Sequence, residues 1–405
     1  MADNPFSKII KGALTVGSAA RDVMLNALKP RPSCVSLYSA FGANGRVIVM
    51  GRALRDEPLP AASTTDTPLK NLVAMLRRAD ADPIAHALVR VHVGSATHQY
   101  TADDEGFFVG YMDATNPQRI DDEWAQLTGE LVEGVGPLAA VTARGAGRAY
   151  YPTFVPEQLV ISDIDDTVLQ SKVTNLLHAV KTVAFGNART RLPFPGVAAF
   201  YQALRDGSSG SQRNPLFYVS SSPWNLHDVI SQFLELQRIP AGPIMLRDLD
   251  IGLDTLASSR HHAHKREMIR RVLTTYPTVP AILIGDSSQQ DPEIYRDVVR
   301  EYPGRIRAVY IRNVTMNQER SRAIQALADE ILAAGSSLVL ADDTLAAARH
   351  AAEHGFIRPD RLEAVAHEKR ADEGVTDEKG DAPGARDAAD TPTPTVVVEE
   401  KPRSA

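Results

Sequence analysis

The stretch LVISDIDDT, residues 159–167, decides the fold class. Its first residues form an apolar run typical of a buried strand, and the acidic residues Asp163, Asp165 and Asp166 follow. In a parallel sheet, ligands bind at the edge where the strands have their carboxyl ends. Strand alternation points Asp163 and Asp165 to the same side and Ile164 into the core, so two carboxylates can address one ligand. An isolated match of this kind fits an Asp-rich turn that caps a helix equally well.

Further apolar runs after Pro156 alternate with amphipathic helical stretches. Such alternation predicts a parallel sheet with helices on both faces. The expected strands are Leu216–Ser220, Ile244–Leu246, Ala281–Ile284 and Ile306–Ile311. A helix over 317–334, a strand over 338–341 and a helix over 344–354 extend the unit.

Polar residues follow two of these strands. Ser220 to Ser222 precede Pro223, which predicts a helix start whose free N–H groups favour an anion, although serine clusters before proline are usually capping turns. Asp286 and Asp291 follow the strand over 281–284 and can line one turn. Magnesium prefers one or two carboxylates together with water and phosphate oxygens, so Asp163 with Asp286 would suit it.

One basic residue completes the set. Lys265 is expected to open an amphipathic helix that carries Met268 and Ile269. Because the helix dipole disfavours a cation there, this position hints at an anionic partner, while a solvated lysine is the ordinary interpretation.

Taken in this order, the four elements resemble the haloacid dehalogenase-like (HAD) phosphohydrolases, which carry an aspartate pair, a Ser/Thr, a Lys and a GDxxxxD motif on successive elements. A closer resemblance, to the actin-patch-type phosphatidate phosphatases, is carried by SDIDDT (162–167), FPGV (194–197), NPLFYVSSSPWNL (214–226) and GPIMLRD (242–248). It is strong over residues 156–315 and looser upstream. The resemblance implies an α/β fold with a HAD-like Rossmannoid three-layer parallel sheet.

The resemblance also implies roles for the acidic residues. Asp163 would be the nucleophile that forms an aspartyl-phosphate, and Asp165 would protonate the leaving alkoxide and then activate water. Asp166 ranks below Asp165 because alternation points it away. Mg²⁺ would be held by Asp163, the backbone carbonyl of Asp165 and Asp286, with Asp291 orienting the ligands.

Two further roles follow from the resemblance. Ser220 and Lys265 would hold the phosphoryl oxygens as charge redistributes. The chain departs from the expected pattern only nearby, where Asn313 stands in place of an expected Asp. This departure puts a peripheral contact in doubt and leaves the reaction intact.

The 405 residues are too many for one ordinary core, and we expect four parts. These are an amphipathic helix over 1–29, a small β-rich, sandwich-like domain over 30–155, the phosphatase domain over 156–366 and a disordered acidic tail over 367–405. In the β-rich part the expected strands are 35–38, 46–50, 87–93 and 138–142, with a helical insert over 69–77 and a hairpin turn at 104–106. From Glu368 on, ten acidic and six basic residues carry −4 of the net charge of −6.

Composition limits the environment and the partners. No apolar run approaches the roughly 18 residues of a spanning helix, and the single Cys34 suits a reducing compartment. The mildly acidic balance argues against nucleic acid as a partner. We expect a cytoplasmic protein; residues 4–29 could lie on the inner membrane surface, but a helix packed on the protein itself is the commoner interpretation.

The sequence therefore predicts a Mg²⁺-dependent phosphatidate phosphatase acting on a phospholipid. One alternative is a HAD phosphatase for phosphoproteins, nucleotides or inositol phosphates, and another is a lipid- or protein-binding module without catalysis. The cluster His261, His262 and His264 could suggest zinc, but a polar segment before a helix is the favoured interpretation. Arg247 could contact a headgroup phosphate or cover the surface.

Overall fold

The computed structural model describes residues 33–38, 40–55, 82–132, 142–164, 195–247, 257–314, 317–373 and 396–398. The helix predicted over 1–29, the helical insert over 69–77, most of the strand over 138–142, and the residues Asp165 and Asp166 lie outside these ranges.

The first part of the described chain is a ten-stranded sheet, so the predicted β-rich region is confirmed. Its order is β6-β5-β8-β10-β2-β3-β1-β9, with β4 and β7 also paired to β3. The strands are β1 (Ser33–Leu37), β2 (Ala40–Ala43), β3 (Arg46–Arg55), β4 (Asp82–Pro83), β5 (Leu88–Val93), β6 (Ala96–Thr101), β7 (Phe107–Asp113), β8 (Trp124–Leu131), β9 (Thr142–Ala143) and β10 (Gly145–Tyr150). The sheet folds over itself, since β1 contacts β8 and β10 as well as its own neighbours.

The turn at Asp104–Gly106 is present, but it does not close a hairpin. Asp103 Oδ1 accepts hydrogen bonds from the N–H groups of Glu105 and Phe107, and Gly106 has φ +78°, which favours glycine. The strand that follows, β7, pairs with β3 and not with the preceding β6. The prediction of a hairpin was wrong because the local turn signal does not determine which strand β7 pairs with.

The second part is a mixed α/β unit around a seven-stranded sheet of order β13-β12-β11-β14-β15-β16-β17. Its strands are β11 (Leu159–Asp163), β12 (Leu216–Pro223), β13 (Ile244–Arg247), β14 (Ala281–Asp286), β15 (Ile306–Arg312), β16 (Ser337–Ala341) and β17 (Val396–Val398). All neighbouring pairs are parallel except β16 with β17. The predicted parallel sheet is confirmed.

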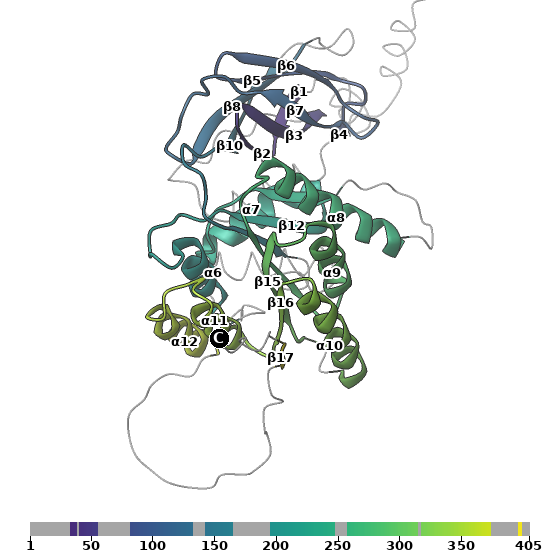
Figure 1. Cartoon of the computed structure of the whole chain (residues 1–405). Coiled ribbons are helices and arrows are strands. Elements are labelled where there is room, and N and C mark those ends of the chain that lie inside the picture. The colour runs from purple at the N-terminus through teal and green to yellow at the C-terminus, as the bar shows by residue number, and fades with distance from the viewer. Residues whose placement is uncertain are drawn as a thin grey trace, which may run out of the picture.

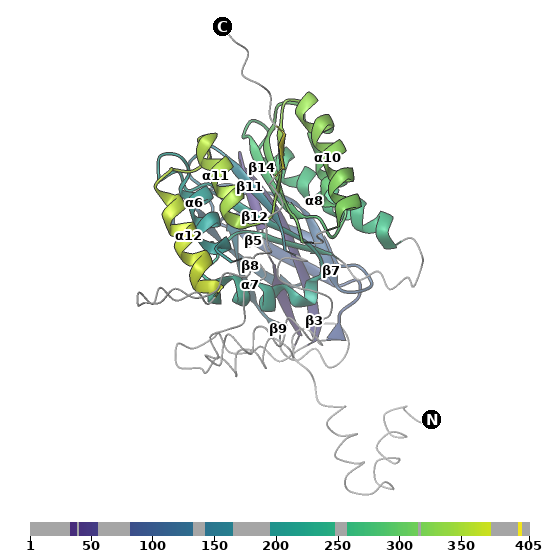
Figure 2. The same ribbon diagram turned by 90° about the horizontal axis from the view of Figure 1, so that it is seen from below.

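Helices cover both faces of this sheet, with α6, α11 and α12 on one side and α8 and α10 on the other (Figure 2). The helices are α6 (Val197–Asp206), α7 (His227–Leu236), which follows the 3₁₀ turn η1 (Trp224–Leu226), α8 (Ala257–Thr275), α9 (Asp291–Glu301), α10 (Gln318–Ala333), α11 (Thr344–Glu353) and α12 (Arg361–Asp372). Within the described residues no helix is both long and apolar enough to cross a bilayer.

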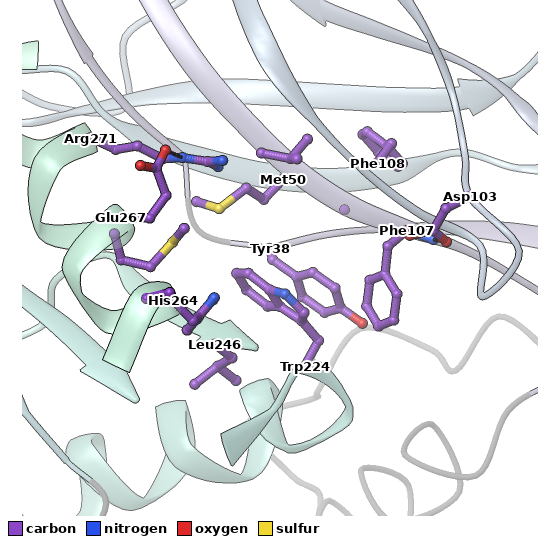
Figure 3. A pocket seen from close by; sticks show the side chains of 14 residues that line it. Tyr38, Met50, Asp103, Phe107, Phe108, Trp224, Leu246, His264, Glu267 and Arg271 are labelled. Atoms are coloured by element: carbon purple, nitrogen blue, oxygen red, sulfur yellow. Dashed lines mark hydrogen bonds and ion pairs between the residues drawn. The ribbon is translucent and has the colours of Figure 1, made fainter. Parts of the chain in front are cut away.

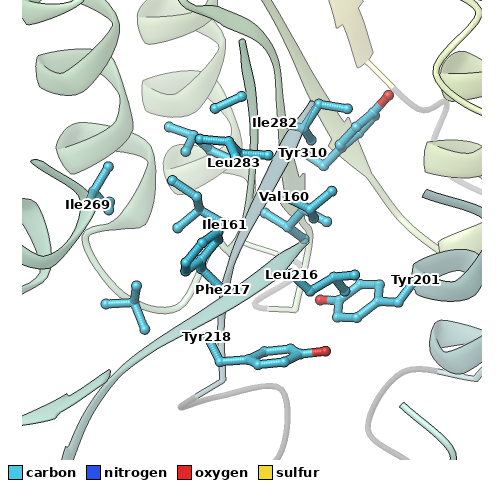
Figure 4. Packing of buried hydrophobic residues seen from close by; sticks show 14 of the residues in the cluster. Val160, Ile161, Tyr201, Leu216, Phe217, Tyr218, Ile269, Ile282, Leu283 and Tyr310 are labelled. Atoms are coloured by element: carbon cyan, nitrogen blue, oxygen red, sulfur yellow. The ribbon is translucent and has the colours of Figure 1, made fainter. Parts of the chain in front are cut away.

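One apolar cluster spans both sheets, and the β-rich region has a second cluster of its own. The β-rich region sits on the α/β unit, close to β12 and α8 (Figure 1). Phe41 meets Phe217 edge to face with ring centroids 5.3 Å apart, and Tyr276 donates a hydrogen bond of 3.1 Å to the carbonyl of Gly42. Strand side chains such as Ile161, Phe217 and Leu283 continue this cluster through the second sheet (Figure 4). The boundary predicted at residue 155 therefore separates two sheets that bury their side chains together.

The predicted tail begins too early. Residues 367–372 continue α12, because the charged residues that resemble a tail have partners in the fold. Glu368 and Asp372 accept hydrogen bonds from the N–H groups of Ala199 and Gly196 at the start of α6, 2.6 and 2.8 Å long. Residues 396–398 also lie in the predicted disordered tail, but they form strand β17, a β-branched run that pairs with β16.

We predict that Lys369→Met lowers the free energy of unfolding by about 0.5–1 kcal/mol at pH 7, because Lys369 Nζ lies 2.8 Å from Asp343 Oδ2 in a partly exposed pair. Burial raises the pKa of Asp343, but the hydrogen bonds from Lys369 and from the N–H of Ala346, together with the charges of Lys369 and Arg349, outweigh it, so this pKa lies below its ordinary value. The stabilisation is therefore present above the unfolded carboxyl pKa and is lost as the pH falls through the folded one.

Urea denaturation from pH 7 down to about pH 2.5 tests this expectation. The exposed Arg370 of the same helix supplies a control, Arg370→Met. A stability difference between the two variants that persists at the acid end would contradict the assigned pair.

Candidate active site

Three carboxylates meet at the carboxyl edge of the parallel sheet. Asp163 ends β11, Asp286 ends the adjacent strand β14, and Asp291 is the first residue of α9. One carboxylate oxygen of each lies within 4.8 Å of the others, and all three residues are buried. The structure thus brings together three of the acidic residues that the sequence singled out.

The topology explains why they meet. The chain runs from β11 outward to β12 and β13, and then returns to the other side of β11 to form β14, β15 and β16. The strand order therefore reverses between β11 and β14, and such a switch point opens a crevice at the carboxyl ends of the strands. Asp163 and Asp286 are the last residues of those two strands.

Gly285 makes room for Asp291. A Cβ on Gly285 would stand 2.3 Å from Asp291 Oδ2, so only glycine lets this carboxylate lie against the strand. Asp291 Oδ2 accepts a hydrogen bond of 3.2 Å from the N–H of Asp286. At the start of α9 the carboxylate also interacts favourably with the helix dipole.

Lys265 lies among these carboxylates. Its Nζ is 2.8 Å from Asp163 Oδ1 and 2.5 Å from Asp291 Oδ1, and the residue is only 2% exposed. The expectation that Lys265 opens its helix was wrong, because α8 begins at Ala257. The anionic partners of this lysine are side chains of the same site, which the helix-dipole argument could not identify.

The predicted position of the histidine-rich segment (His261, His262 and His264) was also wrong. It was expected to precede the helix, but α8 already includes it, so His262 and His264 are helical residues. Each of the two is partly buried.

The charges at this edge are not balanced. Burial raises the pKa of Asp291, and repulsion from Asp286 adds to this, while Lys265 opposes both. Burial lowers the pKa of the neighbouring Arg312 to about 10, although Asp286 and Asp343 oppose the shift. Three carboxylates and one lysine leave an excess of negative charge, which favours a bound cation.

Asp286 supplies the most direct sign of such a cation. Its Oδ1 accepts hydrogen bonds from the N–H and the hydroxyl of Ser288, each 2.6 Å long. Its Oδ2 is buried and has no hydrogen-bond partner among the residues that the structure describes. A hard cation prefers such oxygen donors, so the set formed by Asp163, Asp286 and Asp291 fits Mg²⁺.

Ser220 lies at the same edge. It follows Val219, which pairs with Asp163 in the register of β11 and β12, and it is fully buried. Its Oγ accepts a 2.9 Å hydrogen bond from the N–H of Ser222. Pro223 still belongs to β12, and the helical turn begins one residue later, at Trp224. Arg247 ends β13 at this edge as well.

Two positioning residues escaped the sequence analysis. Tyr201 of α6 lies 2.6 Å from Ser162 Oγ, which itself donates to the carbonyl of Asp163, so the tyrosine hydroxyl is the donor of this pair. Arg320 of α10 donates to the carbonyls of Ser287 and Gln289 and pairs with Glu293, which fixes the loop after β14. Tyr201 follows FPGV (194–197) in a stretch that carries the family resemblance, but the resemblance assigned it no role, and Arg320 stands in no motif.

Asn313, where the chain departs from the expected pattern, has a hydrogen-bond partner. Asn313 Nδ2 donates a 3.0 Å hydrogen bond to Asp342 Oδ1, after the end of β16. The amide thus supplies a donor that a carboxylate could not.

Comparison with known proteins points to the same part of the chain. Residues 158–313 match the family model described as "Phosphatidate phosphatase APP1, catalytic domain". This segment carries an APP1-type catalytic domain. It contains Asp163, Ser220, Lys265, Asp286 and Asp291, and the family recognised from the sequence is confirmed for it.

Two curated relatives match about the same length of chain. Phosphatidate phosphatase APP1 of Saccharomyces cerevisiae is 29% identical over 153 residues, and an uncharacterized protein of Schizosaccharomyces pombe is 27% identical over 156. The matched segments cover 38% of this chain and 25% of each relative. A carbohydrate acetylesterase from Xanthomonas citri is among the solved structures with a likeness, at 10% identity and a TM-score of 0.23, with 66% of each chain covered.

We predict that Lys265→Met destabilises the protein by roughly 3–5 kcal/mol, because it leaves Asp163 and Asp291 buried without their cation. Chemical denaturation measures the loss. The double variant Lys265→Met/Asp291→Asn should recover part of it, since both members of one pair are then removed. Additive losses in this cycle would show that the two side chains do not interact.

Proposed function

We propose that this chain is a Mg²⁺-dependent phosphatidate phosphatase that hydrolyses phosphatidate to diacylglycerol and phosphate. The observation that carries the proposal is the buried set of Asp163, Lys265, Asp286 and Asp291, which lies inside the segment that matches the APP1 catalytic domain. The name of the yeast relative supplies the substrate.

The strand order supports the finer assignment to the HAD-like phosphohydrolases. The first strand, β11, is central and ends in the proposed nucleophile, and β14 beside it ends in the GDxxxxD motif over residues 285–291. A second sheet and helices on both faces complete the proposed architecture of β-rich and phosphatase domains.

In the proposed reaction Asp163 attacks the phosphorus of the ester. The bond between phosphorus and the glycerol oxygen breaks as an aspartyl-phosphate forms, and Asp165 gives a proton to the leaving alkoxide. Asp165 then takes a proton from water, which attacks the aspartyl-phosphate and releases phosphate with Asp163 restored. Lys265 and the Ser220 hydroxyl would hold the phosphoryl oxygens throughout.

Asp163, Asp286 and the backbone carbonyl of Asp165 would hold Mg²⁺, with Asp291 orienting the loop. A bound Mg²⁺ neutralises phosphate charge and lets a carboxylate approach it. Lys265 Nζ lies within 2.8 Å of Asp163 and 2.5 Å of Asp291, and would hold the proposed nucleophile in place through this ion pair.

We also propose that the protein is cytoplasmic and meets its substrate peripherally at the inner membrane surface. A phospholipid substrate requires such contact, and nucleic acid has no place in this proposal. The helix expected over 1–29 would supply the contact.

Phosphate release from phosphatidate in mixed micelles tests the function. With Mg²⁺ we expect turnover that EDTA removes and that Asp163→Asn lowers by roughly a thousandfold or more, since the nucleophile is lost. Asp329→Asn on the exposed face of α10 is the control and should behave as the native protein.

Other outcomes discriminate the alternatives. Turnover of a soluble phosphomonoester that needs Asp163, without turnover of phosphatidate, would keep the phosphatase and reject the lipid substrate. No turnover of either substrate would favour a binding module.

Metal binding has its own readout. We expect millimolar Mg²⁺ to raise the thermal midpoint of the native protein, because a ligand that binds only the folded state stabilises it. Asp286→Asn should reduce this shift, since the Oδ2 atom that has no hydrogen-bond partner in the described structure is a proposed ligand. An equal shift in Asp286→Asn and in Asp329→Asn would contradict the site.

A further inference from the structure

A cavity of about 320 Å³ lies between the β-rich region and the α/β unit. Figure 3 shows Tyr38, Met50 and Phe107 from the first region facing Trp224, Leu246 and His264 from the second. Its volume is within the range of small-molecule sites. Tyr, Phe and Trp side chains line it together with the methionines Met50 and Met268, which can adapt to a flexible ligand, and with the charged residues Asp103, Glu267 and Arg271.

Several lining residues are close in the chain to residues of the candidate active site. Trp224 comes two residues after Ser222, whose N–H donates to Ser220, and His264 is the neighbour of Lys265 on α8. Leu246 belongs to β13, the strand next to β12. Two lining residues, Trp224 and His264, therefore lie within four positions in the chain of the proposed phosphate-binding residues Ser220 and Lys265.

The cavity reaches the surface along β7. Strand alternation sets Phe107, Val109 and Tyr111 on one face, and their exposed fractions are 8%, 49% and 41%. Phe107 and Val109 line the cavity, and Tyr111 continues the row outward. An apolar row that leads from a cavity to solvent calls for an apolar partner.

We propose that this cavity binds an acyl chain of the lipid whose phosphate is held at Asp163 and Lys265. The inference rests on the proposed function and extends it to the apolar part of the substrate. A polar site for the phosphate, and a cavity with aromatic and aliphatic walls lined by chain neighbours of that site, match the two parts of an amphiphilic phosphomonoester. Glu267 and Arg271 lie on the cavity wall and form an ion pair of 3.0 Å, so their charged groups bind each other.

The acyl-chain dependence of hydrolysis tests the cavity. We compare kcat/KM for dioctanoyl and dibutyryl phosphatidate and take the ratio, so that effects on the chemical step cancel. Val109→Asp should lower this ratio about tenfold, the loss expected when roughly two methylene groups lose their burial. Val155→Asp makes the same change at a valine that is 78% exposed and outside the cavity, and should leave the ratio as in the native protein.

A second variant fills the cavity from the helix side. Ala263→Trp on α8 adds bulk at an exposed position of the lining and should lower the same ratio, while Thr274→Trp, exposed on the same helix but away from the cavity, should not. An unchanged ratio in both Val109→Asp and Ala263→Trp overturns the proposal.

Direct binding separates this inference from the proposed function. The chain has two tryptophans, and only Trp224 lines the cavity. Monomeric dioctanoylglycerol, which lacks the phosphate, should change the tryptophan fluorescence saturably, and Trp224→Phe but not Trp124→Phe should remove the change. If no phosphomonoester is hydrolysed but this binding is found and weakened by Val109→Asp, the proposed function fails and the cavity assignment stands. If phosphatidate is hydrolysed but no such binding is found, the cavity assignment fails alone.

Discussion

The burial of Lys265 between Asp163 and Asp291 is the interaction on which the rest of this structure depends. A lysine that is 2% exposed is stable only where acidic partners replace water, and this lysine in turn offsets part of the charge of the three buried carboxylates. The reversal of strand order between β11 and β14, the glycine at 285 and the loop held by Arg320 all bring these charges within reach of one another.

The β-rich region packs against residues that neighbour this site in the chain. Its inner face packs on the α/β unit through Tyr38, Phe41 and Phe107, and Tyr38 stacks on Trp224 with ring centroids 4.9 Å apart. Trp224 follows the strand that ends in the serine cluster, so the region contacts the surroundings of the site as well as the core. In the proposed account the β-rich region contributes a wall to the cavity that would select the apolar part of the substrate, whereas the sheet edge would provide the chemistry.

The sequence predicted those features that depend on local pattern. Strand periodicity located Asp163 and Asp286 at strand ends, and alternation of strands with helices gave the parallel sheet. Features that depend on tertiary partners were missed or misplaced. The predicted start of α8 was too late, because a run of His and Arg resembles a polar loop. The predicted tail included the end of α12, because Glu368 and Lys369 resemble solvent-exposed residues in the sequence. Their partners, at the start of α6 and at Asp343, are known only from the structure. Tyr201 and Arg320 act through hydrogen bonds to residues distant in the chain, which sequence spacing does not predict.

The central claim is that Asp163 acts as the nucleophile of a phosphatase. Acid quenching during steady-state turnover of phosphatidate, followed by peptide mass spectrometry, tests it most directly. The account predicts a phosphoryl group on the peptide that contains Asp163, formed by the native protein with Mg²⁺ and absent from Asp163→Asn. Turnover without a phosphoryl-enzyme, or a phosphoryl group on another residue, would contradict it.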